Sequence, residues 1–170
     1  MLSGEKKSQF ETLVRAYSAE LYRYAYWLCR DRFLAEDLVQ EAFARAWQSW
    51  EGLRDDRAAK SWIYTILRNE HARVYERKHV EIDDAQELDE IVDGASMAAF
   101  EQFEMREALE ALPRTYREPL LLQVLGGFSC VEIGNMMNIS EGAVMTRLTR
   151  ARLALRQKSG MESRRKVKVL

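Results

Sequence analysis

Apolar residues recur along this chain at intervals of three and four, and no stretch of useful length alternates with period two. Spacing of this kind is typical of amphipathic helices. The N-terminal half has three such stripes: Phe10, Leu13, Val14, Tyr17, Leu21, Ala25 and Leu28; Ala35, Leu38, Val39, Ala42, Phe43, Ala46 and Trp47; Trp62, Ile63, Ile66, Leu67 and Val74. The pattern predicts an all-α protein whose first three helices share one small core.

The charge pattern changes after the third stripe. Between His79 and Met105 the sequence has nine acidic residues and neither lysine nor arginine. Such a segment has too few large apolar residues to offset the entropy of ordering it, so it is interpreted as a linker. We therefore predict two small helical domains, residues 1–79 and 100–160, joined by an acidic linker at 80–99. Residues 161–170 form a basic tail, for which disorder is one interpretation.

Turn signals divide the second domain into helices. Pro113 interrupts the first of them, Pro119 is predicted to begin the apolar helix PLLLQVL, and Gly126 and Gly127 are predicted to end it. The next segment, 129–156, has start and stop signals of its own.

Two capping signals lie only eleven residues apart in that segment. Ser129 and Glu132 have the spacing of a capping box, which predicts a short helix, and Asn138 is suited to end that helix in a left-handed conformation. Ser140 is a second candidate N-cap, and Gly142 is predicted to avoid crowding the preceding helix. A short helix followed closely by a longer basic one is the sequence form of a helix-turn-helix.

The second helix of this motif has distinct faces. On a helical wheel, Val144, Leu148, Ala151 and Leu155 form the buried stripe, and Thr146, Thr149, Arg150 and Leu153 lie opposite. Arg147 lies at one edge of the outward face, and Met145, Arg152 and Arg156 lie at the other. Threonine and arginine together suit a helix that enters the major groove of DNA. A solvated helix with arginines that serve only solubility is the alternative.

Overall charge conceals this arrangement, because the net charge of the 170 residues is only −1. From Val144 to Leu170 there are nine basic residues and one acid, Glu162, which favours contact with phosphates. Acidity in the linker cancels this local excess.

Composition excludes several classes of function. The chain is 47% hydrophobic and 31% charged, as in soluble globular proteins, and its apolar runs are too short to cross a bilayer. The N-terminus does not resemble a signal peptide, so we expect a cytoplasmic protein without membrane insertion of its own. Cys29 and Cys130 are too far apart in sequence to suggest a metal site or a disulfide, and are expected to be buried. His71 and His79 form no zinc motif, so no metal, cofactor or catalysis is expected.

Aromatic and basic residues alternate between positions 50 and 78. The aromatic residues are Trp50, Trp62, Tyr64 and Tyr75, and the basic residues are Arg54, Arg57, Lys60, Arg68, Arg73, Arg77 and Lys78. Aromatic side chains can stack on unpaired bases, and basic side chains can bind the phosphate backbone. This combination is typical of proteins that recognise single-stranded nucleic acid. For Trp47 and Trp62, which belong to apolar stripes, a core position is the favoured alternative. Core packing explains Arg54, Asn69, Arg73 and Arg77 less well.

The order of these segments resembles a known family. DLVQEAF, LRDD, SWIYTILRN, the acidic linker, LPRTYREPLLL and SCVEIGNMMNISEGAVMTRLTRARLAL follow one another as in bacterial RNA polymerase sigma factors of the extracytoplasmic function (ECF) group of the sigma-70 family. The resemblance covers most of the chain. It implies a sigma-2 helical bundle, a sigma-4 helix-turn-helix, and promoter recognition and melting as a subunit of RNA polymerase.

Site residues follow from the same resemblance. Asp37, Gln40, Glu41 and Phe43 match the helix that docks on the beta-prime clamp helices of core polymerase. In the minus-ten region, Leu53 and Arg54 match a pocket for a flipped base, and Asn69 and Arg73 lie on the following helix. Met145, Thr146, Arg147, Thr149 and Arg150 match residues directed at the minus-35 major groove.

Further partners are implied too: the beta flap of core polymerase, promoter DNA and an anti-sigma factor. Two other hypotheses remain open from the residues themselves. One is a helix-turn-helix regulator that binds a duplex operator alone, and the other is an RNA-binding or nuclease-like enzyme, which would need an acid–base or metal cluster.

Overall fold

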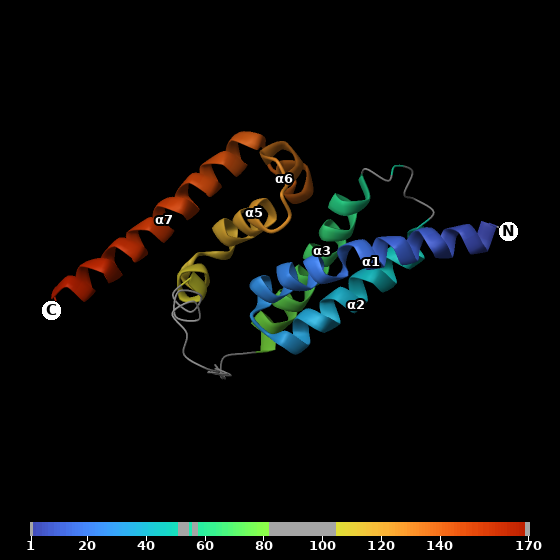
Figure 1. Cartoon of the computed structure of the whole chain (residues 1–170), viewed down its shortest axis with the longest axis horizontal. Coiled ribbons are helices and arrows are strands. Elements are labelled where there is room, and N and C mark those ends of the chain that lie inside the picture. Colours follow the sequence, from blue (N-terminus) through green and yellow to red (C-terminus); the bar gives the residue numbers. More distant parts are fainter. Residues whose placement is uncertain (1, 51–54, 56–57, 82–104, 169–170) are drawn as a thin grey trace. The chain divides into compact units, whose positions relative to one another are not determined.

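The computed structural model describes residues 2–50, 55, 58–81 and 105–168. Its named helices are α1 (Leu2–Cys29), α2 (Arg32–Gln48), α3 (Ala59–Glu81), α5 (Arg114–Val124), α6 (Cys130–Met137) and α7 (Glu141–Lys168), and residues 105–111 are also helical (Figure 1). All regular secondary structure in the described part is helical, which confirms the predicted all-α class. Leu53, Arg54 and nearly all of the predicted linker lie outside the described residues. Within the described ranges, no helix has the length and apolar character to cross a membrane.

The chain divides into two compact units. The N-terminal unit comprises residues 1–83 with 124–128, and the C-terminal unit comprises residues 84–123 with 129–170. Helix α3 continues to Glu81, past the predicted domain limit at 79, and α7 continues to Lys168, past the predicted limit at 160. The described part of the basic tail therefore continues α7, and Gly160, which directly precedes it, does not end the helix.

A two-residue connection joins α1 to α2. Arg30 has a positive φ of 58° and ends α1, and its backbone N–H donates to the carbonyl oxygen of Tyr26 at 2.7 Å. Asp31 then caps α2, where its carboxylate accepts from the backbone N–H of Leu34 at 3.0 Å. So short a turn places α1 and α2 side by side, and α3 packs against both (Figure 1).

The core of the N-terminal unit lies between these three helices. Its buried members are Leu13, Leu21, Tyr24, Ala25, Leu28, Ala35, Leu38, Ala42, Ala46, Ala59, Ile63, Tyr64 and Leu67. Helix α2 contributes mainly alanine to this set, and small side chains allow neighbouring helices to approach closely. Most of the predicted stripes therefore become the core. Cys29 and Cys130, predicted to be buried, are only partly buried, because each lies at the end of a helix.

A polar contact links α1 and α3 within this core. The Tyr64 hydroxyl donates to Glu20 Oε1 at 2.8 Å, and Lys60 Nζ lies 3.0 Å from the same oxygen. Burial raises the pKa of the Tyr64 hydroxyl, and the hydrogen bond to Glu20 and its charge act in the same direction. Tyr64 therefore remains a neutral donor to Glu20.

The prediction that a helix starts at Pro119 is wrong. Helix α5 begins at Arg114, and Pro119 lies inside it, where it is fully buried. Proline removes one backbone N–H, so the carbonyl of Thr115 loses its helical donor; the exposed position of Thr115 allows water to replace it. The neighbouring Glu118 is also buried and is paired with Arg114 at 3.4 Å. Burial of this turn favours the helix over the local preference of proline.

Both capping signals of the helix-turn-helix are confirmed. Ser129 Oγ accepts from the backbone N–H of Glu132 at 3.2 Å, and Glu132 Oε2 accepts from the backbone N–H of Ser129 at 2.7 Å. Asn138 ends α6 with φ 55° and ψ 46°, and Ser140 Oγ accepts from the backbone N–H of Ala143 at 3.1 Å. Each bond satisfies a donor that a helix start leaves free.

The glycine that the turn requires is Gly134 rather than Gly142. A Cβ atom at Gly142 would meet nothing within 4 Å, so the prediction that Gly142 avoids a crowded neighbour is wrong. A Cβ atom at Gly134 would lie 2.8 Å from the carbonyl oxygen of Ile139. The backbone N–H of Ile139 also donates to the Gly134 carbonyl at 3.0 Å, which holds the turn against α6. Gly142 follows the residues of this tight contact, Ile139 to Glu141, whereas Gly134 faces them from α6.

Candidate nucleic-acid and polymerase interfaces

Helix α7 has the two faces that the wheel predicts. Val144, Leu148 and Ala151 are buried, which confirms the inner stripe, and Leu155 is half-buried. Met145, Thr146, Thr149, Arg150 and Leu153 are exposed, and Arg147 is half-exposed at the edge of this group. The exposed group is called the outward face of α7. All five residues predicted to contact the minus-35 element lie on it or at its edge.

The two threonines of this face are held by their own helix. Thr146 Oγ1 donates to the carbonyl of Gly142 at 3.0 Å, and Thr149 Oγ1 donates to the carbonyl of Met145 at 2.9 Å. Each hydroxyl hydrogen is therefore used within α7, while the oxygen lone pairs can still accept. The face offers methyl groups and acceptors rather than free hydroxyl donors.

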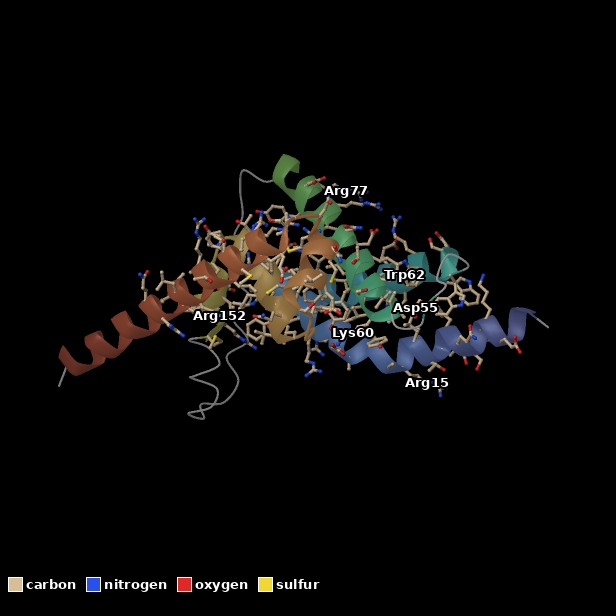
Figure 2. The ribbon with its side chains drawn as sticks, turned by 90° about the horizontal axis from the view of Figure 1, so that it is seen from above. Arg15, Asp55, Lys60, Trp62, Arg77 and Arg152 are labelled. Atoms are coloured by element: carbon tan, nitrogen blue, oxygen red, sulfur yellow. The ribbon has the colours of Figure 1, made fainter. Side chains whose placement is uncertain are left out.

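Two basic residues of α7, Arg152 and Lys158, bind other parts of the C-terminal unit. Arg152 donates to the side-chain oxygen of Gln123, at the end of α5, and Lys158 Nζ donates to the carbonyl of Glu107 at 3.0 Å. Arg152 and Lys158 therefore brace α7 against other helical segments of the C-terminal unit. Arg152 is labelled on α7 in Figure 2. The sequence predicted that the arginines at the edge of the outward face are free to bind phosphate. The contact with Gln123 weakens this prediction for Arg152. Helical periodicity could not reveal that contact, because Gln123 belongs to another helix.

An acidic surface follows α2 of the N-terminal unit. Asp37, Gln40 and Glu41 are exposed, and Glu41 Oε1 lies 3.0 Å from Arg45 Nε. Phe43, predicted with them, is only half-buried, and its ring packs edge-on against Phe10 of α1 with centroids 6.2 Å apart. Three of the four residues predicted to bind polymerase therefore share an accessible surface, and Phe43 supports the helix from its inner side.

A hollow of about 200 Å³ lies between α2 and α3. Its wall is formed by Arg45, Gln48, Ser49, Trp62, Ile66, Asn69, Glu70 and Arg73. Asn69 and Arg73, both predicted for the minus-ten site, lie about one helical turn apart on α3, and Trp62 lies about two turns before Asn69 on the same wall. Trp62 lies near the beginning of α3 and Arg77 toward its other end (Figure 2).

Aromatic rings continue from this hollow toward α1. Trp62 lies 6.0 Å from Trp50, and Phe10 lies 5.4 Å from Trp50 and 5.0 Å from Trp47 between ring centroids. Trp47 is 41% exposed, so the prediction that it belongs to the core is wrong. It lies in the last turn of α2, where Phe10 and the nearby Lys6, 5.3 Å from its ring, cover it incompletely.

Two charged members of the hollow, Arg45 and Glu70, were missed in the sequence. Arg45 belongs to α2, and Glu70 lies on α3 between the predicted residues Asn69 and Arg73. Glu70 is 6% exposed and pairs with both Arg45 and Arg73. The spacing of Glu70 and Arg73 by three residues was an available signal, but nothing in one sequence indicates that Arg45 of another helix meets them.

Two segments of the chain match models of known protein families. Residues 13–81 match the family model of Sigma-70 region 2, and residues 102–155 match that of Sigma-70, region 4. A chain with both regions, a helical bundle and a capped helix-turn-helix, belongs by its class to the sigma-70-type transcription factors.

Curated relatives refine this class. The chain is 33% identical over 153 residues to the ECF RNA polymerase sigma factor SigM of Bacillus subtilis, covering 86% of this chain and 92% of that protein. It is 32% identical over 146 residues to the ECF RNA polymerase sigma factor SigL of Mycobacterium tuberculosis, covering 82% of each. This chain belongs to the ECF group of RNA polymerase sigma factors, as its sequence motifs predicted.

Solved structures agree with the fold. The sigma factor RpoE of Bartonella quintana, in complex with the anti-sigma factor NepR, matches with a TM-score of 0.72 and 25% identity, over 91% of this chain and 96% of that one. CnrH, in complex with the cytosolic domain of CnrY, matches with a TM-score of 0.69 at 23% identity, over 89% of this chain and 87% of that one. The second likeness concerns the fold alone.

Proposed function

We propose that this sigma factor brings core RNA polymerase to promoters by a division of labour between its two units. The N-terminal unit binds core polymerase and the melted minus-ten region, and the C-terminal unit binds the minus-35 duplex. The observation that supports this most strongly is the outward face of α7, where five candidate DNA-contacting residues lie together opposite the buried side of the helix. A stand-alone regulator explains this face but leaves the hollow on α3 without a role.

In the C-terminal unit, α7 lies in the major groove. Thr146 and Thr149 present methyl groups and hydroxyl oxygens, which suit contacts with thymine methyl groups and base donors. Arg147 and Arg150 contact phosphates or guanine at the side of the same face, and Met145 adds apolar contact. The positive charge of α7 strengthens binding to any duplex, and the central residues select the sequence.

In the N-terminal unit, the hollow receives part of the non-template strand. Trp62 supplies an aromatic surface, and Asn69 and Arg73 supply polar and charged groups along one side of α3. The resemblance assigns contact with a flipped base to Leu53 and Arg54, which lie outside the described residues. Opening base pairs costs a few kcal/mol, and stacking of an unpaired base on an aromatic ring returns about 1–3 kcal/mol.

Core polymerase binds the acidic surface of α2. Asp37, Gln40 and Glu41 are exposed together, and their charge suits a basic docking site on the beta-prime clamp helices. The C-terminal unit contacts the beta flap. The acidic linker lies toward the basic RNA exit path, where its charge mimics nucleic acid.

An anti-sigma factor controls this activity by covering polymerase-binding surfaces. Support comes from the similar sigma factor RpoE of Bartonella quintana, whose structure was solved in complex with the anti-sigma factor NepR. The expected partner competes with core polymerase for these surfaces.

Promoter-specific transcription with purified core polymerase tests the proposal. Core polymerase is incubated with fragmented genomic DNA from the source organism, with and without this chain, and transcript starts are mapped. We expect starts that depend on the chain and share two upstream sequence elements. Absence of any such start, combined with tight duplex binding by the chain alone, would favour a stand-alone regulator instead.

A further inference from the structure

Glu70 is a buried carboxylate shared by two arginines of different helices. Its side chain is 8% exposed, and its Oε1 lies 2.5 Å from Arg45 Nε of α2 and 3.0 Å from Arg73 Nη1 of α3. Arg45 also contacts the exposed Glu41 at 3.0 Å. The three groups therefore form a bridge between α2 and α3 along the wall of the hollow.

Both arginines keep donors available to a ligand. Their side chains are 42% and 51% exposed, although the carboxylate between them is nearly covered. A guanidinium has five N–H donors in a fixed plane, so contact with one carboxylate oxygen fixes its direction and leaves other donors open. Both arginines line the hollow, together with Trp62 and Asn69.

Stability alone is a weak explanation for this arrangement. Burial of a carboxylate is unfavourable unless it is paired, and buried ion pairs are often no more stabilising than apolar residues of similar size. An arrangement that fixes two half-exposed cations beside a hollow is better explained by a ligand with negative charge. Single-stranded DNA, with one phosphate for each stacked base, has this chemistry.

We infer that Glu70 is a positioning residue, which holds Arg45 and Arg73 in place to bind backbone phosphates of the melted non-template strand. This inference rests on the proposed function, and it adds Arg45 as a phosphate contact. For removal of the Glu70 charge, it also predicts a change in DNA binding opposite to the one expected from charge alone. Removal of the Glu70 charge raises the local positive charge and would strengthen DNA binding if the arginines acted only as charges. Loss of their orientation instead weakens it.

The test uses holoenzyme of the full chain on a promoter that the wild type opens. Permanganate reactivity of unpaired thymines measures the open fraction, and competition for core polymerase is measured separately. The variants are Glu70→Gln, which removes the charge, and Glu70→Asp, which keeps the charge but withdraws the carboxylate. Glu11→Gln is the matched control, because it makes the same charge change in an exposed pair with Lys7, at 4.0 Å on α1.

We expect about a tenfold loss of open complex with Glu70→Gln and a loss with Glu70→Asp, the scale of one hydrogen bond to a charged group. We expect core binding to stay unchanged and both variants to remain folded at the assay temperature. Glu11→Gln behaves as wild type. Glu70→Gln also has a smaller effect when Arg73 is already alanine, because the two residues act through one contact.

Three results would overturn the inference. Opening equal to or above wild type in Glu70→Gln means that charge, not orientation, matters. Full additivity of Glu70→Gln with Arg73→Ala means that Glu70 does not act through Arg73. Failure of the wild-type chain to open any promoter rejects the proposed function as well, and it is seen before the variants are compared.

Discussion

Replacement of Gly134 by alanine tests the geometry of the helix-turn-helix. The added Cβ atom would lie 2.8 Å from the carbonyl oxygen of Ile139 and 3.6 Å from the backbone nitrogen of Glu141. Both neighbours are backbone atoms, so the turn itself must move. Crowding of this kind costs about 1–3 kcal/mol in packed regions. Replacement of a helical glycine by alanine also stabilises the helix by up to about 1 kcal/mol, which partly offsets the destabilisation by crowding.

Gly142→Ala is the matched control. It introduces the same methyl group into the same motif, where nothing lies within 4 Å. Because both variants share the change in helix propensity, the difference in their free energies of unfolding reports mainly the crowding at Gly134. We expect Gly134→Ala to be the less stable by about 1–3 kcal/mol. For a unit of this size, each kcal/mol lowers Tm by about 4–8 °C.

Thermal unfolding followed by far-UV circular dichroism measures this difference. All four tryptophans, at positions 27, 47, 50 and 62, belong to the N-terminal unit, so their fluorescence gives a second signal for that unit alone. We expect Gly134→Ala to shift the dichroism transition more than the fluorescence transition. Equal stability of the two variants would refute the close approach of α6 to the turn.

Three further predictions address other parts of the molecule. Arg150→Ala should weaken minus-35-dependent initiation by about 5–100-fold, the range for loss of a good contact, while core affinity stays constant; equal loss of core binding would contradict its assigned face. Asp37→Asn should weaken core polymerase binding, measured by competition, without changing duplex DNA binding; an unchanged core affinity would argue against the acidic surface of α2. Tyr64→Phe should lower the free energy of unfolding by about 1 kcal/mol, through loss of the hydrogen bond to Glu20. Because the folded state raises the pKa of Tyr64 above its ordinary value, the preference for a neutral phenol is fully present below about pH 10 and is lost above it. Chemical unfolding between pH 8 and about pH 11 should therefore show a steeper decline for wild type than for Tyr64→Phe; parallel curves would contradict this.

Local chemistry made much of the fold predictable. The capping box of Ser129 and Glu132, the left-handed Asn138 and the second cap at Ser140 depend on residues only a few positions apart. The two faces of α7 follow from the helical period in the same way, because every residue of the helix shares one geometry. Pro119 shows the limit of such signals, since burial in α5 overrides its preference for a helix start.

By itself, the sequence determined the helical class, the position of the helix-turn-helix and the direction in which Thr146, Thr149 and Arg150 point. The tertiary structure decided that Glu70 joins Arg45 to Arg73, that Arg152 turns to Gln123, and that Gly134 rather than Gly142 must remain small. The physical reason is that a helical period fixes which residues share a face, but not which residues of another helix they meet. That second choice depends on how the helices pack. The candidate minus-ten hollow is an example, because residues of both α2 and α3 form its wall.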